Sequence, residues 1–570
     1  MVKEVAESKT LHGPPLAEAT GIGALTLGAF LLEVAERYGD RELLIFYEAD
    51  SATRISWTYN ELLNQSMTLA AAMIAGGITK GTRVGLVMGS RPECVATIFA
   101  AALAGAVVVP LSTMASADEM AYLIRHADIH TLFTQQSLGG KHQPLKMLCD
   151  LCPPLREAKT GDFYSEQFPY LRQLVALGFE GGEGAVVGWQ EYIAKGSTVP
   201  PAIVRARCDE VSPADMGLII YSSGTTANPK GVLHTQRAPT LQAWHQAKIF
   251  CRTPDTRIWT TFPLFWTAGF NTVMGATMAA GGSWVMQELF EAGAAIKLVE
   301  KEKVTEPYAL PHHTGAMEEH ADWLQADFSA VRCVSGRSPF TRHASTTEQN
   351  KNWHGVWAYG ASETCAISIT HYANTALDII SASAGRLLPG NSLRVVDTNS
   401  GDLLGVGEEG ELCLKGPTLM ERYVKASRES CFDADGFFHT GDSGFYDKDG
   451  YVHWTGRLTD MIKTAGANVS PAEVQRVIQR VLPTFKISQV MGVPDERLGQ
   501  IVVLCVVLQE GDSQTEEDIR QALKAHLASY KVPRRVLFFE EEDIPMTASG
   551  EKVKDAELRE LAARRIASTN

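Results

Sequence analysis

Apolar positions between residues 57 and 134 alternate between two periods. Residues 62–75 and 94–103 have helical spacing, whereas 84–88 and 107–111 are short apolar runs. Spacing near 3.6 residues predicts helices, and short apolar runs predict buried strands. Strands that alternate with helices are typical of a parallel sheet covered by helices. We therefore expect a large α/β body of several layers.

Near the end of the chain, helix-start signals are combined in a few residues. Ser470 suits an N-cap, Pro471 the first helical position and Glu473 the capping-box position. The apolar residues that follow share one helical face: Val474, Val477, Ile478, Val481 and Leu482. A helix is predicted to begin here.

Two apolar strand runs, 490–493 and 501–508, follow that helix, and a second helix is predicted over 519–530. These elements predict a compact α+β domain. We place its boundary at Arg457, so that the chain divides into an N-terminal domain, 1–456, and a smaller C-terminal domain, 457–570. Residues 138–212 are less regular and rich in Pro and Gly, which favours an insertion or surface excursion.

Composition is ordinary for a globular enzyme, with 45% apolar and 21% charged residues, and 570 residues exceed what one core supports. A net charge of -14 argues against a nucleic-acid partner, because duplex binding needs a basic face. The ten cysteines have no framework spacing, the N-terminus has no secretory pattern, and the apolar run 98–111 falls short of the ~20 residues of a membrane span. We expect a cytoplasmic protein with no transmembrane segment.

The segment 218–231 carries the most informative motif: an apolar strand run leads into a loop rich in hydroxyls and glycine and ending in Pro229, Lys230 and Gly231. Small residues let backbone N–H groups approach an anion, hydroxyls add donors, and Lys230 adds positive charge. The loop suits a polyphosphate, although it lacks the Walker ending. A plain Ser/Thr-rich turn would not require the Pro-Lys-Gly ending.

With this loop the chain resembles the class I adenylate-forming superfamily, which contains acyl-CoA synthetases, peptide-synthetase adenylation domains and beetle luciferases. The resemblance runs from about residue 27 to 559. It implies that the loop wraps the β- and γ-phosphates of ATP and that Thr226 acts in catalysis. The residues that would take part are Ser222, Ser223, Gly224, Thr225, Thr226 and Lys230.

A second motif of that family matches residues 359–363. The resemblance implies that Tyr359 packs on adenine beside Gly360, that Ser362 meets the α-phosphate where the family usually has threonine, and that Glu363 binds Mg²⁺. One carboxylate beside phosphate oxygens is enough for Mg²⁺. The adenine-side strip begins at Gly336, and its next residue adds a positive side chain of unknown role.

A third motif, 438–442, implies that Asp442 accepts both ribose hydroxyls, and Arg457 matches the arginine that also reaches the ribose. Residues 410–412 resemble a structural strand of the family with a packing role. Residues 441–444 also resemble the nucleophile motif of trypsin-like proteases. That alternative fails because such a protease is a secreted, disulfide-bearing double barrel.

On the acyl side the chain departs from the family, because Trp266 stands where a histidine is usual, ahead of Gly269. A bulky ring there could gate or shorten the pocket for the acid. The usual hinge Asp or Lys is Thr459 here. The loop 463–468, with Lys463 and Gly466, would face the thiol channel after the small domain rotates.

The adenylation lysine of the family matches Lys552 when Glu551 is treated as a one-residue insertion, and Lys554 is the alternative. The three histidines His312, His313 and His320 could form a metal site. We prefer packing, because no carboxylate or cysteine spacing supports a metal.

Together the resemblance implies an AMP-forming ligase that uses ATP, Mg²⁺ and coenzyme A to activate a hydrophobic fatty, aryl or alicyclic carboxylic acid. Catalysis would rest on Lys552, Thr226 and Glu363. Two alternatives stay open: an adenylation enzyme that serves a carrier protein in trans, and a nucleotide-binding pseudoenzyme, which Glu551 suggests. The oligomeric state is open too, with a homodimer as one alternative.

Overall fold

The computed structural model divides into two compact units. The large unit consists of His12–Ser392 and Lys415–Gly436, and the terminal unit consists of Leu393–Leu414 and Phe437–Asn570 with the first residues of the chain. The structure describes residues 9–569 apart from 49–52, 141, 159–162, 182–183, 223–228, 335–337, 348–352, 355, 357, 465–466, 496, 510, 525, 528–529 and 547–552. The predicted boundary at Arg457 lies inside the terminal unit and stays a prediction about which parts move.

An eight-stranded sheet forms the centre of the large unit. In spatial order its strands are β21 (Arg422–Tyr423), β10 (Lys230–Thr235), β9 (Met216–Ser222), β5 (Val107–Pro110), β4 (Arg83–Val87), β6 (Thr131–Gln135), β7 (Gln173–Leu177) and β8 (Val186–Gly188). The pairs from β9 to β8 are parallel, and β10 and β21 join antiparallel. The predicted parallel sheet is confirmed.

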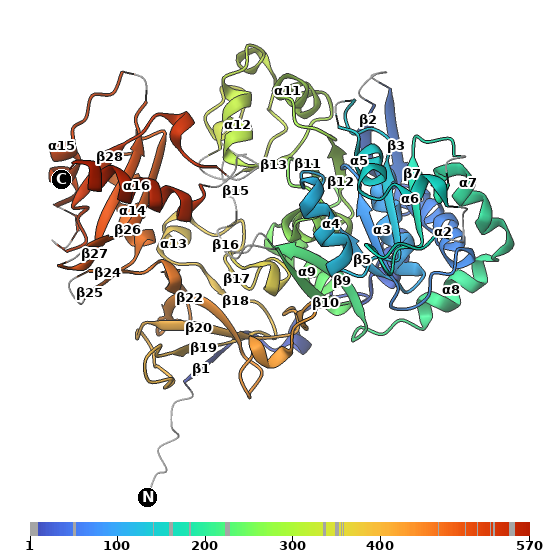
Figure 1. Ribbon diagram of the computed structural model, residues 1–570, viewed down its shortest axis with the longest axis horizontal. Helices are drawn as coiled ribbons and strands as arrows, with labels where there is room; N and C mark the ends of the chain where they lie inside the picture. The colour runs from blue at the N-terminus through green and yellow to red at the C-terminus, as the bar shows by residue number, and fades with distance from the viewer. Residues whose placement is uncertain are drawn as a thin grey trace, which may run out of the picture. The chain divides into compact units, whose positions relative to one another are not determined.

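Helices α2 (Tyr59–Ala75) and α3 (Pro92–Leu103) pack beside each other next to this sheet (Figure 1). A capping box between Thr58 and Glu61 starts α2. Helix α3 is buried at eleven of its twelve positions, all but Glu93. A helix that is apolar all round belongs in a core, and this explains why the run 98–111 is so hydrophobic.

The prediction of an insertion over 138–212 was wrong for its central part. Strands β7 and β8 extend the parallel sheet, and α7 (Trp189–Ala194) and α8 (Pro201–Asp209) follow them. Strands β7 and β8 have only five and three residues, and turn-forming Gly and Pro lie around them. Their partner strands lie far away in sequence, so local periodicity does not identify them.

A second sheet in the large unit has five strands. Their order is β13 (Glu306–Tyr308), β11 (Arg257–Thr260), β12 (Ser283–Met286), β2 (Glu42–Tyr47) and β3 (Arg54–Thr58), with only β3 antiparallel to its neighbour. At its β13 edge, Glu306 forms a buried ion pair with Arg252 at 2.6 Å. The Arg252 guanidinium also donates to Thr272 O, so the pair is satisfied on several sides.

The terminal unit contains two sheets. One has the order β1 (Thr10–His12), β19 (Ser392–Val396), β20 (Gly410–Lys415), β22 (Phe438–Tyr446) and β23 (Val452–Arg457). The other has β25 (Ala467–Val469), β24 (Ile462–Thr464), β27 (Gly499–Val507) and β26 (Ile487–Asp495), with β28 (Arg535–Phe538) on β27. Helices α14 (Pro471–Val481), α15 (Glu516–Lys524) and α16 (Asp555–Thr569) belong to this second, C-terminal part.

The predicted start of α14 is confirmed, because the Ser470 side chain accepts a hydrogen bond from Glu473 N at 3.2 Å. The predicted second helix over 519–530 is too long: α15 ends at Lys524. The N–H groups of His526 and Leu527 both donate to Leu523 O, a tightened turn that closes the helix. The apolar pattern continues to Leu527 because that side chain still packs in the core.

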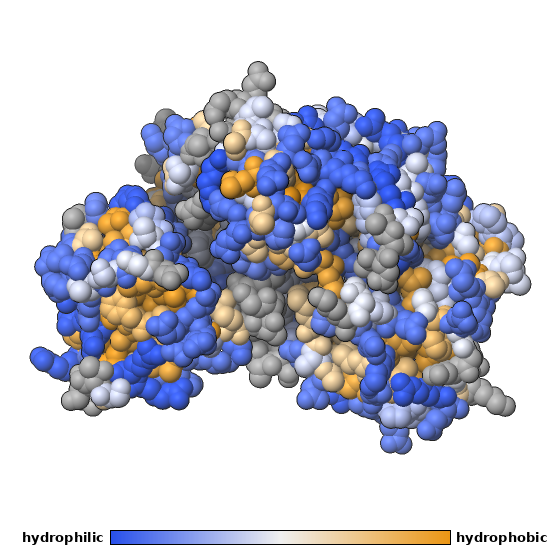
Figure 2. Space-filling view, turned by 90° about the horizontal axis from the view of Figure 1, so that it is seen from above, coloured by the Kyte–Doolittle hydropathy of each residue, from blue (hydrophilic) through white to orange (hydrophobic). Residues whose placement is uncertain are grey.

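Apolar side chains on the surface lie in separate groups among hydrophilic ones (Figure 2). The most exposed large apolar residue is Leu324, at 86%, among those that the structure describes.

Across the described helices, none is both long enough and apolar enough to cross a membrane.

Candidate active site

The predicted phosphate loop joins two paired strands of the large unit. Strand β9 ends at Ser222, β10 begins at Lys230, and these two residues lie opposite each other in the antiparallel ladder. Ser223, Gly224, Thr225 and Thr226 lie outside the described residues, so their roles stay predictions. The described part of the motif is therefore a pair of antiparallel strands whose ends, Ser222 and Lys230, lie opposite each other.

Helix α4 (Ala117–His126) holds both ends of this loop (Figure 1). Tyr122 Oη donates to Pro229 O at 3.1 Å, and His126 Nδ1 shares a hydrogen bond of 2.8 Å with Tyr221 Oη. Burial lowers the pKa of His126 and raises that of Tyr221. Burial thus favours the neutral form of both groups, and the two hydrogen bonds fix where the loop begins and ends.

Tyr423, which no sequence pattern indicated, connects Glu363, the predicted Mg²⁺ ligand, with Lys230. Tyr423 Oη donates to Glu363 Oε1 at 2.7 Å, and Lys230 Nζ lies 5.1 Å from the centroid of the Tyr423 ring. Strand β21 pairs with β10 and thereby places Tyr423 opposite Val232. The two-residue strand β21 has no periodicity that could have indicated it.

Buried polar side chains hold the segment 359–367. Gln242 of α9 (Arg237–Ile249) donates to Thr364 O and Ile367 O, and Asn271 of the π-helix Ala268–Gly275 donates to Cys365 O at 2.9 Å. His234 Nε2 donates to Ser362 O at 2.8 Å. Burial lowers the pKa of His234 to about 4, so this histidine is neutral near pH 7.

Backbone geometry in this segment is unusual. Cys365 has φ 57° and Ala366 has φ 105°, backbone angles that residues other than glycine rarely adopt. A Cβ on Gly360 would lie 1.7 Å from Ala366 O. Such conformations persist where surrounding contacts enforce them, and they cluster at functional sites. Tyr359 ends the short strand β16 (Ala358–Tyr359), and Ser362 begins a 3-10 turn.

On the predicted acyl side, Trp266 lies in an aromatic group of the large unit. Its ring centroid is 6.1 Å from that of Phe262 and 6.0 Å from that of Phe265, and Phe262 stacks on Tyr308 at 4.8 Å. A Cβ on Gly269 would lie 2.0 Å from Pro263 O, so only glycine fits there. Both residues lie in an apolar setting, and their contact with an acid stays a prediction.

Asp442 and Arg457, the predicted ribose pair, meet in the terminal unit. They lie opposite each other in β22 and β23, and Arg457 Nε is 3.0 Å from Asp442 Oδ1. Arg457 also donates to Thr440 O at 2.9 Å. The Asp442 side chain is buried and that of Arg457 is half exposed. An oriented carboxylate of this kind can accept hydrogen bonds from two neighbouring hydroxyls.

Other predicted residues are described only in part. Lys463 lies in β24 and is exposed, whereas Gly466, Gly336 and Lys552 lie outside the described residues. Lys554 is described and pairs with Glu557 at 2.8 Å. The choice between Lys552 and Lys554 therefore stays open.

Of the three histidines considered as a metal site, His312 and His313 pack against each other, and His313 also packs on an aromatic ring. The rings of His312 and His313 are 4.0 Å apart, and His313 lies 4.2 Å from the Phe290 ring. Burial lowers the pKa of His313 to about 4. His320 Nδ1 instead accepts from Asp322 N at 3.2 Å.

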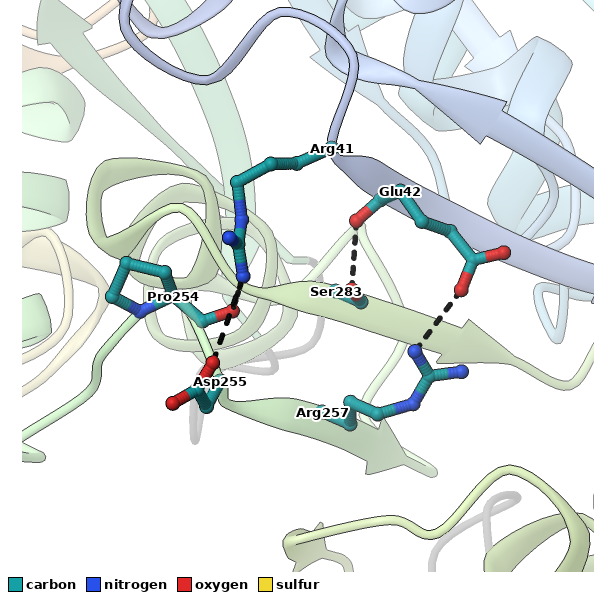
Figure 3. Close-up of a pocket in the computed structure, with 6 residues that line it drawn as sticks. All are labelled: Arg41, Glu42, Pro254, Asp255, Arg257 and Ser283. Carbon is teal, nitrogen blue, oxygen red and sulfur yellow. Dashed lines mark hydrogen bonds and ion pairs between the residues drawn. The ribbon is translucent and has the colours of Figure 1, made fainter.

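A pocket of about 370 Å³ in the large unit contains none of the predicted site residues (Figure 3). Arg257 points to Glu42, and Arg41 points to Pro254 and Asp255. The charges that line this pocket are paired with each other. In the terminal unit, a cavity of about 170 Å³ adjoins Arg457 and Trp454.

Family comparisons agree with these motifs. The family model described as "AMP-binding enzyme" matches residues 31–424, and the model "AMP-binding enzyme C-terminal domain" matches 482–551. The putative acyl-CoA synthetase YngI of Bacillus subtilis (strain 168) is 30% identical over 541 residues, which cover 94% of this chain and 96% of that protein. Indoleacetate–CoA ligase of Aromatoleum aromaticum is 31% identical over 515 residues, covering 89% and 94%.

Among solved structures, ATP-bound MatB from Rhodopseudomonas palustris superposes with a TM-score of 0.75 at 23% identity, covering 95% of this chain and 99% of that chain. The anthranilate CoA ligase AuaEII in complex with anthranoyl-AMP gives 0.76 at 22% identity, covering 95% and 98%. These likenesses confirm the α/β fold class with a large N-terminal body and a smaller C-terminal domain. With both family models matched in order along its length, the chain belongs to the family of AMP-binding enzymes.

Proposed function

We propose that this chain is an AMP-forming carboxylic acid:CoA ligase that acts on a hydrophobic acid. Its family and its curated relatives support ATP-dependent formation of an acyl-adenylate followed by transfer to coenzyme A. The observation that carries the proposal is that Tyr423, directly beside the ends of the phosphate loop, contacts both Glu363 and Lys230.

In the first half-reaction, an oxygen of the acid attacks the α-phosphorus of ATP, the bond to the bridging oxygen breaks, and pyrophosphate leaves. Lys230 and the loop would hold the phosphates so that the attacking and leaving oxygens are in line. Lys552 would stabilise the negative charge that develops on the α-phosphate oxygens. Asp442 and Arg457 would fix the ribose, and Tyr359 would pack on the adenine.

The Glu363 carboxylate fits a Mg²⁺ ion. Tyr423 orients Glu363 through Oε1, and a hard cation takes oxygen ligands from one or two carboxylates together with phosphates. The ion would supply neutralisation of phosphate charge. Glu363 would hold it, and the hydrogen bond from Tyr423 would keep that carboxylate oriented towards the ion.

In the second half-reaction, the thiol sulfur of coenzyme A attacks the acyl carbon and AMP leaves. We propose that residues 457–570 rotate between the two steps and present Lys463 and Gly466 to the thiol. Trp266 and Gly269 would border the acid. We also propose that the protein is cytoplasmic and forms a homodimer. Light scattering after gel filtration tests the homodimer.

The test is a screen of pyrophosphate release across fatty, aryl and alicyclic acids, with and without coenzyme A. Indoleacetic, ferulic and anthranilic acids belong in the aryl arm, since relatives are named for them. We expect acid-dependent pyrophosphate release, and an acyl-CoA product by mass spectrometry when coenzyme A is present. Turnover that requires a carrier protein would favour the first alternative. ATP binding without pyrophosphate release for any acid would favour the pseudoenzyme.

A further inference from the structure

Three potential metal ligands meet on the sheet of the terminal unit, at residues to which no catalytic role has been assigned. Glu411 and Cys413 lie on β20, and His439 lies opposite Cys413 on β22. His439 Nδ1 is 2.9 Å from Glu411 Oε2 and 3.4 Å from Cys413 Sγ. All three ligand atoms lie within 4.8 Å of one another. From the family resemblance, residues 410–412 were expected to have only a packing role, and the three ligands are up to 28 positions apart in the sequence.

The spacing of these atoms suits a tetrahedral cation. Zn²⁺ binds sulfur at about 2.3 Å and nitrogen or oxygen at about 2.0 to 2.2 Å, which places neighbouring ligand atoms roughly 3.3 to 3.6 Å apart. The sulfur-to-nitrogen separation already falls in that range, and the nitrogen-to-oxygen separation needs to open by less than ~1 Å. Two paired strands fix the backbone of all three residues. Binding of a cation therefore requires only small adjustments of the three side chains.

The donor set also limits which cation fits. Mg²⁺ and Ca²⁺ take oxygen ligands, whereas a set of thiolate, imidazole and carboxylate suits Zn²⁺ and similar soft ions. Cys413 is fully buried, Glu411 is mostly buried, and the His439 side chain is 40% exposed. The site is therefore closed by protein on the sulfur side and open to solvent beside the imidazole.

We propose that Glu411, Cys413 and His439 form a binding site for a soft divalent cation of the Zn²⁺ type, separate from the Mg²⁺ site at Glu363. With three protein ligands and an open side, a water molecule would take the fourth position. Binding would release the Cys413 thiol proton to solvent, shift the imidazole proton of His439 to Nε2, and replace the direct Glu411–His439 hydrogen bond by two bonds to the ion.

The site also contacts the predicted ribose segment. Glu411 Oε1 accepts from Gly441 N at 2.9 Å, and Gly441, with φ 71°, immediately precedes Asp442. A cation that moves the Glu411 carboxylate therefore changes the support of this turn. We expect the cation to weaken ATP use; this second step rests on the proposed function, whereas binding of the cation does not.

The test of binding uses the full-length chain, freed of metal by a chelator and titrated with Co²⁺. Cobalt bound to a thiolate gives a sulfur-to-metal charge-transfer band, and a four-coordinate site gives intense visible bands. We expect one equivalent of Co²⁺ to produce both, and Zn²⁺ to displace them. His439→Gln and Cys413→Ser should each abolish the sulfur band, whereas Cys431→Ser, a half-buried thiol outside the cluster, should retain it.

If Cys413→Ser fails to fold, the His439→Gln variant tests the cation site by itself. His439 is half exposed, so this substitution should be tolerated, and circular dichroism can verify that the variant is folded. No sulfur band in the wild-type chain, or a band that survives His439→Gln, would overturn the proposal. In that case the three side chains only hydrogen-bond to one another. Loss of the band in Cys431→Ser would assign it to another thiol and overturn the proposal equally.

The link to ATP is measured separately, as the KM for ATP with saturating Mg²⁺ and added Zn²⁺. We expect Zn²⁺ to raise this KM in the wild-type enzyme and not in His439→Gln. If Co²⁺ binds but Zn²⁺ raises KM equally in both, the cation site stands and its link to the ribose segment is wrong. If no acid supports turnover, the proposed function fails while the spectroscopic result is unaffected.

Discussion

At the scale of single residues, Tyr423 is the most informative residue that the structure adds to the predicted site. Its hydroxyl orients Glu363, and its ring lies beside Lys230. One phenol thus touches both a predicted metal ligand and a predicted phosphate ligand. Asp442 and Arg457 form the corresponding ion pair at the predicted ribose site.

Tyr423→Phe should raise the Mg²⁺ concentration needed for half-maximal pyrophosphate release. The variant removes a hydrogen bond to a charged group, which contributes about 1.5 to 3 kcal/mol, and leaves the ring in place beside Lys230. The measurement is the Mg²⁺ dependence of the initial rate. Tyr372→Phe, an exposed tyrosine of the same unit, is the matched control. Equal Mg²⁺ dependence of the two variants would contradict the orienting role.

Asp442→Ala should raise the KM for ATP by about 10- to 150-fold, because the ribose hydroxyls lose a charged acceptor worth about 1.5 to 3 kcal/mol. Steady-state kinetics with ATP as the varied substrate measure this. Asp449→Ala, an exposed position in the same unit, should leave the KM unchanged. An unaltered KM in Asp442→Ala would remove the ribose assignment.

At the scale of elements, the predicted active-site segments depend on close backbone contacts that the surrounding helices enforce. Residues 359–367 run between the buried amides of Gln242 and Asn271, with two left-handed residues, Cys365 and Ala366. Helix α4 similarly fixes the two ends of the phosphate loop. Glycine at position 360 is what allows the first of these segments to fold on itself.

Gly360→Ala should abolish pyrophosphate release and lower Tm, because its Cβ would overlap Ala366 O and the backbone would have to move. Gly315→Ala provides the contrast: Gly315 lies in α12 (Pro311–Glu318), and a Cβ there meets nothing within 4 Å. That variant should stabilise the protein by up to about 1 kcal/mol, the difference in helix propensity. Thermal unfolding and an activity assay of both variants check the pair. A fully active Gly360→Ala would show that the segment tolerates a shift.

At the scale of the whole molecule, buried histidines link stability to pH. Burial lowers the pKa of His234 to about 4, against 6.5 for the free side chain, and the same holds for His245 and His313. Above pH 6.5 these groups are neutral in both states. As pH falls from 6.5 towards 4, the unfolded chain takes up protons that the folded chain does not, so the unfolding free energy decreases.

For His234 the decrease is on the order of 3 kcal/mol, since each pKa unit corresponds to about 1.4 kcal/mol. His234→Asn should therefore show a shallower loss of unfolding free energy between pH 6.5 and 4 than the wild-type chain. Urea unfolding at a series of pH values measures both slopes. Parallel slopes would mean that His234 does not contribute to this loss.

The proposed rotation of residues 457–570 separates the two half-reactions, and a substitution of Lys552 tests this separation. Lys552→Ala should slow adenylation by about 10²- to 10³-fold, the usual cost of one donor to developing charge. The same variant given preformed acyl-AMP should still make acyl-CoA, because the rotated domain presents a different face. Quenched-flow assays of each half-reaction measure this. If Lys554→Ala rather than Lys552→Ala loses adenylation, the alignment is shifted by two residues.

Local signals were sufficient wherever an element depends on its sequence neighbours. The start of α14 depends only on the Ser470 hydroxyl and the backbone N–H of Glu473, three residues later. The alternation of helices and strands over 57–134 follows from apolar side chains that share one face of each element. The strand run before the phosphate loop could be identified for the same reason. The resemblance of whole motifs then supplied the predicted roles of Asp442, Arg457 and Glu363.

Only the tertiary structure decided which distant segments meet. Tyr423 reaches Glu363 because β21 pairs with β10, and β7 joins the central sheet because β6 lies beside it. Glu411, Cys413 and His439 meet because β20 and β22 are adjacent. Strand pairing is set by the burial of a whole sheet rather than by the few residues of each strand, so no window of sequence around these residues contains the information.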